Sequence, residues 1–230
     1  MRVNELLEER AAQTPRKLAL VCGEERYSYA QIDNLARRFA AALLEGGLAA
    51  GDRVAICLEN SVDAIVAIFG VLKADGVFFV VNPQARREYR DSLLADSGAA
   101  AMVARGADGA VQISWLSAAH DSGPHLDLAA LVYTSGSTGT PKGVMLTHRN
   151  LTFGAESICT YLENSADDVI LSVLPLSFTY GLGQVMTAFR SGATLVLERS
   201  FTYPRASCTP PMHSSPATPG GDGSPCASRT

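Results

Sequence analysis

The sequence lacks a long uninterrupted hydrophobic run. Its most apolar span, residues 62–81, is broken by Lys73 and Asp75. Acidic residues stand near the N-terminus, where a signal peptide would carry an apolar stretch. Both absences argue against a membrane span and a secretory leader. We therefore expect a soluble, cytoplasmic protein.

An excess of basic residues is also missing. The 19 Lys and Arg residues are outnumbered by 23 Asp and Glu residues, which leaves a net charge of −4. Nucleic acid is therefore not an expected partner. The five cysteines include no Cys-x-x-Cys pair and no His at metal-binding spacing. We expect free thiols in a reducing compartment and predict no metal site from them.

What the sequence does contain is an alternation of strand-like and helix-like segments. Its 230 residues, 47% of them hydrophobic, can bury one sizeable core or two small ones. The patterns predict helices near residues 3–11, 32–43, 62–72, 89–94, 150–162 and 182–190. They predict strands at 18–21, 26–29, 54–58, 77–81, 100–103, 111–115, 169–174 and 194–197, with 169–174 buried. This order is typical of an α/β fold in which helices flank layered, mainly parallel sheets.

Residues 131–148 contain a stretch rich in glycine and hydroxyl side chains, between two segments that favour strands. Glycines at 136, 139 and 143 let the backbone adopt positive φ and approach a ligand, so that consecutive amides can bind an anion. Hydroxyl donors stand beside them, and Lys142 adds a positive charge. The hydroxyl donors are Thr134, Ser135, Ser137, Thr138 and Thr140. The composition predicts a phosphate-binding loop.

Two alternatives bear on this stretch. A Walker A loop requires glycine before its lysine and Ser or Thr after it, whereas this sequence has Pro141 and Gly143 at those positions. A plain turn is the other alternative, since Ser, Thr and Gly often gather between strands. A turn, however, needs neither five hydroxyls nor a lysine after proline.

Residues 133–143, Tyr-Thr-Ser-Gly-Ser-Thr-Gly-Thr-Pro-Lys-Gly, resemble the signature loop of the adenylate-forming superfamily of AMP-dependent synthetases and ligases. The resemblance extends from residue 3 to about residue 206 and is nearest to acyl-CoA synthetases and acyl-AMP ligases. It implies that a carboxylic acid is joined to AMP from ATP, with loss of pyrophosphate. The acyl group would then pass to the thiol of coenzyme A or of a carrier protein. By resemblance, Lys142 is catalytic, and Thr134, Ser135, Gly136, Ser137, Thr138, Gly139 and Lys142 bind the nucleotide.

Residues 175–181, Pro-Leu-Ser-Phe-Thr-Tyr-Gly, are similar to the family motif that lines the acyl pocket. Phe178 and Tyr180 are therefore candidate pocket residues, with ordinary core aromatics as the alternative. Members that activate amino acids often have Asp after this phenylalanine, to pair with the substrate ammonium, whereas this sequence has Thr179. An unpaired ammonium in a partly buried site is costly. We therefore expect a fatty, aryl or other acid with an uncharged tail.

The C-terminal residues 207–230 are rich in Pro, Ser, Gly and Thr and show no apolar periodicity. We expect no helix and no central strand there. Either this is a disordered tail, or the reading frame was lost after Ala206, and the abrupt change of composition favours the second explanation. We expect residues 1–206 to form a partial AMP-binding N-terminal domain with a subdomain junction near 106–127.

By resemblance, several functional groups would lie beyond residue 206. They are the Tyr-Gly-x-Thr-Glu motif whose acid helps to hold Mg²⁺, the ribose-binding Asp and the lysine of a C-terminal lid. Two functions therefore stay open. The chain is part of an ATP-dependent carboxylate ligase that is inactive alone, or it is a non-catalytic remnant that at most binds nucleotide weakly.

Overall fold

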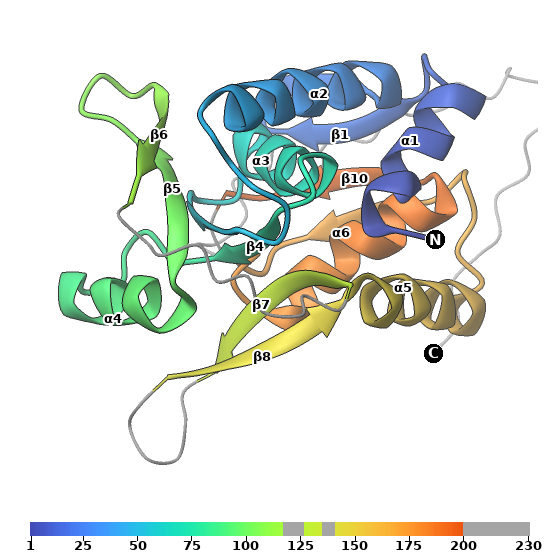
Figure 1. Cartoon of the computed structure of the whole chain (residues 1–230). Helices are drawn as coiled ribbons and strands as arrows, with labels where there is room; N and C mark the ends of the chain where they lie inside the picture. Colours follow the sequence, from blue (N-terminus) through green and yellow to red (C-terminus); the bar gives the residue numbers. More distant parts are fainter. Residues whose placement is uncertain (117–126, 135–140, 200–230) are drawn as a thin grey trace, which may run out of the picture.

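The computed structural model describes residues 1–116, 127–134 and 141–199, arranged as two sheets with helices packed on them (Figure 1). The helices are α1 (Val3–Gln13), α2 (Tyr29–Glu45), α3 (Val62–Lys73), α4 (Arg87–Ser97), α5 (His148–Leu162) and α6 (Thr179–Ser191). The strands are β1 (Leu18–Cys22), β2 (Glu25–Ser28), β3 (Arg53–Cys57), β4 (Val77–Val80), β5 (Ala99–Arg105), β6 (Val111–Trp115), β7 (Leu128–Thr134), β8 (Lys142–Thr147), β9 (Val169–Ser172) and β10 (Thr194–Leu197). The predicted α/β class is confirmed.

The larger sheet has six strands in the order β6-β5-β3-β4-β7-β8. Its four central strands pair in parallel, and the edge strands β6 and β8 are antiparallel to their neighbours. The smaller sheet has four strands in the order β2-β1-β10-β9, and only β2 runs antiparallel. Because strands β3 to β8 all belong to the larger sheet, residues on both sides of 106–127 contribute to it. The proposed subdomain junction stays a prediction.

Local side-chain hydrogen bonds define where two helices begin. Ser28 accepts a hydrogen bond from the backbone N–H of Gln31, and the Gln31 side chain accepts one from the N–H of Ser28. Thr147 and Asn150 repeat this reciprocal arrangement at the start of α5. Such capping boxes satisfy N–H groups that have no partner within the helix. They turn the chain directly from strands β2 and β8 into α2 and α5.

One hydrophobic core connects the two sheets through the helices. It includes Leu20 and Leu195 from the smaller sheet and Val54 from the larger one. At its centre the ring of Phe189 in α6 packs against Tyr29 of α2 and Phe69 of α3, with centroids 5.6 and 4.8 Å apart. A second, smaller cluster around Phe79 and Leu93 includes residues from β3, β4, β5 and α4.

A buried ion cluster joins the first three helices. The side chain of Lys73 in α3 is 7% exposed, and its ammonium lies 2.8 Å from Asp33 of α2 and 2.5 Å from Glu8 of α1. Arg37 also contacts Asp33, at 2.8 Å. Buried charges are tolerated when they are paired in this way. Lys73 therefore has a structural role, because it connects α3 to α1 and α2 through ion pairs.

The strand predicted at 169–174 exists, but the expectation that it is buried was wrong. It spans Val169–Ser172 at an edge of the four-stranded sheet, with Val169 66% and Leu171 51% exposed. Side chains alternate between the faces of a strand. One face of β9 packs against α6, while Val169 and Leu171 lie on the other, which no described residue buries. An apolar run alone does not reveal that a strand lies at an edge.

Candidate active site

The loop predicted to bind phosphate connects β7 to β8, which form an antiparallel hairpin. The last pair of this ladder is Thr134 and Lys142. Directly opposed residues of two strands project from the same face of the sheet. The Thr134 hydroxyl and the exposed Lys142 side chain therefore flank the loop on one face. Figure 1 shows this end of the hairpin extending away from the body of the fold.

The remaining loop residues predicted to bind nucleotide lie outside the described residues. These are Ser135, Gly136, Ser137, Thr138 and Gly139. Cys208 and Cys226 and the predicted disordered or out-of-frame segment 207–230 also lie outside them. The assignment of these residues stays a prediction.

The loop end of the hairpin is held by Tyr133. Its hydroxyl donates a hydrogen bond to Asp96 Oδ2 of α4 at 2.7 Å, and its ring meets Phe79 edge-on at a centroid distance of 5.7 Å. Burial, reinforced by the bond to Asp96, raises the pKa of Tyr133, so the phenol stays protonated and keeps donating. This contact links the strand that enters the loop to α4.

The structure corrects the reason given for Gly143. We expected Gly143 to adopt positive φ, but it pairs with Tyr133 in the ladder and is not in the left-handed region. A Cβ added at Gly143 would lie 3.2 Å from Cζ of the Tyr133 ring. Glycine is therefore suited to this position because it leaves room for the anchoring tyrosine.

The two aromatic residues predicted for the acyl pocket come together at the start of α6. Phe178 is the N-cap residue of this helix and Tyr180 lies in its first turn; they are 60% and 68% exposed. Neither is therefore a core residue, which was the alternative interpretation. Gly181 follows, and a Cβ on it would lie 2.5 Å from the carbonyl oxygen of Pro175. The first turn of α6 thus packs tightly on the segment that precedes it.

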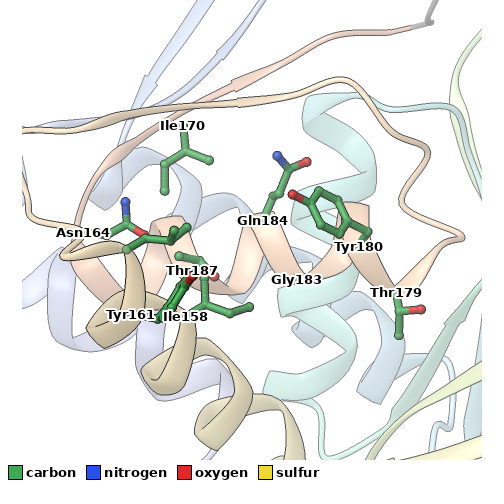
Figure 2. Close-up of a pocket in the computed structure, with 10 residues that line it drawn as sticks. Ile158, Tyr161, Asn164, Ile170, Thr179, Tyr180, Gly183, Gln184 and Thr187 are labelled. Carbon is green, nitrogen blue, oxygen red and sulfur yellow. The ribbon is translucent and has the colours of Figure 1, made fainter.

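Tyr180 borders a cavity of about 550 Å³ between α5, β9 and α6 (Figure 2). Most of its surface is apolar, and among the described residues that line it none is acidic or basic. The lining residues are Ile158, Tyr161, Leu162, Asn164, Ile170, Thr179, Tyr180, Gly183, Gln184 and Thr187. The sequence motif identified Thr179 and Tyr180. It missed the residues of α5, because nothing in the sequence indicates that this helix lies beside α6.

The described cysteines are free thiols. Cys22 and Cys57 are buried and Cys159 is partly buried. Burial raises the pKa of the Cys57 and Cys159 thiols, which disfavours the reactive thiolate. Within residues 1–116, 127–134 and 141–199, no group of three or more His, Cys, Asp or Glu side chains is arranged to hold a metal ion. No helix in the same ranges is both long and apolar enough to cross a bilayer.

Comparison with known families identifies the fold. A sequence model described as AMP-binding enzyme matches residues 7–126 and 116–209. The chain belongs to the AMP-binding enzyme family. The matched residues include both the β7–β8 hairpin and the segment before α6, so the adenylate-forming membership predicted from the loop is confirmed.

Curated relatives of this AMP-binding chain include large peptide synthetases. Bacitracin synthase 1 of Bacillus licheniformis is 34% identical over 213 residues, which cover 85% of this chain and 4% of that protein. A probable non-canonical nonribosomal peptide synthetase, CymA of Salinispora arenicola, is 34% identical over 206 residues, covering 86% and 2%. The chain thus spans a small fraction of these relatives.

Solved structures share the fold over most of the AMP-binding chain. The crystal structure of VinN has 27% identity and a TM-score of 0.76, covering 86% of this chain and 56% of VinN. The N-terminal domain of FACL13 from Mycobacterium tuberculosis has 28% identity and a TM-score of 0.75, covering 87% and 58%. ATP-bound MatB from Rhodopseudomonas palustris has 28% identity and a TM-score of 0.74, covering 88% and 46%. The chain spans about half the length of these proteins.

Proposed function

We propose that this AMP-binding chain is part of an ATP-dependent ligase that joins a carboxylic acid to AMP and releases pyrophosphate. The observation that carries the proposal is the pairing of Thr134 with Lys142 at the mouth of the Gly, Ser and Thr loop, within a chain of the AMP-binding family. ATP is the proposed cosubstrate, accompanied by Mg²⁺, for which no residue of the chain is assigned.

In this proposal Lys142 stabilises charge on the β and γ phosphates and on the departing pyrophosphate. The substrate carboxylate is already ionised at neutral pH, so its attack on the α-phosphate needs no general base. Lys142 is exposed. A contact between its ammonium and one phosphate charge at about 4 Å contributes roughly 1 kcal/mol in water but about 4 kcal/mol in a partly enclosed site. The contribution of Lys142 therefore grows as the site closes around the nucleotide.

We further propose that the acid has an uncharged apolar tail, such as a fatty or aryl acid. Tyr180 lines the cavity between α5 and α6, and Phe178 lies two residues before it in the chain. Since no residue of the described lining carries a carboxylate, an α-ammonium bound there would have no counter-charge from these residues. The proposed acceptor of the acyl group is the thiol of coenzyme A or of a carrier protein. The similarity to peptide synthetases supports a carrier.

Two measurements on the whole chain test this function. The first is the affinity for ATP, measured by calorimetry for the wild type, Lys142→Ala and Lys17→Ala. Lys17→Ala is the control, because it removes the same charge at the residue just before β1. We expect Lys142→Ala to weaken binding at least fivefold, as about 1 kcal/mol requires, and Lys17→Ala to leave it unchanged. Equal affinity in all three proteins would contradict the role of Lys142.

The second measurement is carboxylate-dependent exchange of pyrophosphate into ATP. Exchange that Lys142→Ala abolishes would support the ligase. ATP binding without pyrophosphate exchange, whichever carboxylic acid of a broad panel is added, is expected both of a ligase part that is inactive alone and of a remnant that only binds nucleotide, so only exchange separates the two. A wild-type chain that does not bind ATP at all would contradict the proposed nucleotide-binding role of the loop and of Lys142.

A further inference from the structure

A buried asparagine that no motif identified joins the two sheets beside the proposed acyl pocket. Asn60 lies in the turn between β3 and α3 and is 5% exposed. The turn is itself held by Ser61, whose hydroxyl donates to the Glu59 carbonyl at 3.0 Å and accepts from the N–H of Ala64 at 3.2 Å. The Asn60 side chain therefore projects from a fixed base.

The Asn60 amide makes three hydrogen bonds to the backbone of distant segments. Its Nδ2 donates to the carbonyl oxygens of Leu174 and Glu198, both at 3.0 Å. Its Oδ1 accepts from the N–H of Leu176 at 3.0 Å. Both amide hydrogens and the oxygen are thus used. Leu174 follows β9 and Glu198 follows β10, so the end of β3 in one sheet is tied to the ends of two strands in the other.

The segment that Asn60 holds leads directly into α6. The N–H of Phe178 donates to the Pro175 carbonyl at 3.0 Å, which closes a turn immediately after Leu174. Leu176 is 3% exposed, whereas Phe178 and Tyr180 are exposed. The same short stretch is therefore fixed on its inner side and open on its outer side. In open α/β sheets, ligands bind at the carboxyl ends of the strands, where this stretch lies.

We propose that Asn60 is the positioning residue of the acyl pocket, which it sets by holding residues 174–176 and hence the first turn of α6. This inference rests on the function proposed above. Asparagine suits the position because one short side chain must donate twice and accept once. In Asn60→Asp the acceptor for Leu176 remains, but carboxylate oxygen faces the carbonyls of Leu174 and Glu198. In Asn60→Ala all three backbone groups lose their partner.

The matched control is Asn82, which follows β4, the strand parallel to β3 in the same sheet. The Asn82 side chain is exposed and accepts a local hydrogen bond from the N–H of Gln84 at 2.9 Å. Asn82→Ala therefore removes the same side chain from a comparable position without touching residues 174–176.

The test combines hydrogen exchange with ligand affinity on the whole chain. In Asn60→Ala we expect the amides of residues 174–182 to exchange at least tenfold faster, while those of β7 and β8 keep their rates, and in Asn82→Ala only the amide of Gln84 and its immediate neighbours should change. With octanoate and benzoate as acid probes, the affinity for the acid should fall at least tenfold and the affinity for ATP should stay within twofold. Asn60→Asp, which keeps the acceptor for Leu176, should show the same selectivity, and it replaces Asn60→Ala if that variant does not fold.

The outcomes separate this inference from the proposed function. Unchanged exchange at 174–182, or an increase spread evenly over the chain, would overturn the positioning role. So would equal losses of affinity for acid and for ATP. If the wild type binds ATP but neither acid, the proposed pocket is refuted, and a local rise in exchange would then support only the anchoring of the segment by Asn60.

Discussion

Two glycines in the same helix should respond in opposite ways to the same substitution. In α6, a Cβ on Gly181 would lie 2.5 Å from the Pro175 carbonyl oxygen and 2.8 Å from that of Leu174, whereas a Cβ on Gly183 would meet no atom within 4 Å. The atoms facing Gly181 belong to the backbone, and the Leu174 carbonyl is also held by Asn60. They cannot rotate away as a flexible side chain could.

The magnitudes follow from this difference. Alanine is favoured over glycine within a helix by about 0.5–1 kcal/mol, so Gly183→Ala should stabilise the fold by about that amount. Overpacking costs about 1–3 kcal/mol. Gly181→Ala should therefore destabilise the fold by about 1–2 kcal/mol, after the smaller gain in helix propensity is subtracted.

Urea unfolding of the two variants and the wild type measures both effects. The two free energies of unfolding should differ by about 1.5–3 kcal/mol, which corresponds to melting temperatures separated by roughly 3–12 °C for a chain of this size. Equal slopes of the unfolding curves would show that the denatured states match. A Gly181→Ala protein as stable as the wild type, or shifts of the same sign in both variants, would refute the reasoning.

Two further predictions concern single polar contacts. Burial, with a second contribution from the Arg2 guanidinium, lowers the pKa of His148. The stability that the neutral His148 ring contributes should be complete above about pH 6.5, and it should be lost as the pH falls through this lowered pKa. Urea midpoints at pH 7.5 and 5 should therefore fall more in the wild type than in His148→Asn, and parallel losses would contradict this. Removing the bond to Asp96 in Tyr133→Phe should lower the free energy of unfolding by about 1 kcal/mol; Tyr161→Phe, at a side chain 86% exposed, is the control and should change nothing.

Much of the element order could be predicted from the sequence because it depends on local patterns. Apolar runs and helical periodicity gave the type of each element, and the strand predicted at 111–115 matches β6 (Val111–Trp115). The Gly, Ser and Thr loop was predicted to lie between two strands, and it does connect β7 to β8. These features are decided by residues close together in the chain.

The remaining features depend on pairings between distant residues. The exposure of Val169 follows from the place of β9 at a sheet edge, which an apolar run does not encode. The reason for a glycine at position 143 was predicted wrongly. The ring of Tyr133, which lies close to where a Cβ of residue 143 would be, comes next to it only when the hairpin has formed. Asn60 carries no motif signal, since its three partners lie more than a hundred residues further along.

The parallel pairing of β1 with β10 has a consequence for how the chain is made. Leu20 pairs with Leu195, and the Thr194 hydroxyl donates to the Leu18 carbonyl, a contact that spans 176 residues. At about 5–20 residues per second of synthesis, the first hairpin waits roughly 10–35 seconds for this partner. Such long-range pairing is also intrinsically slow, because the intervening chain must be closed into a loop first. During that interval the apolar face of β1 is a target for chaperones and for misassembly between nascent chains.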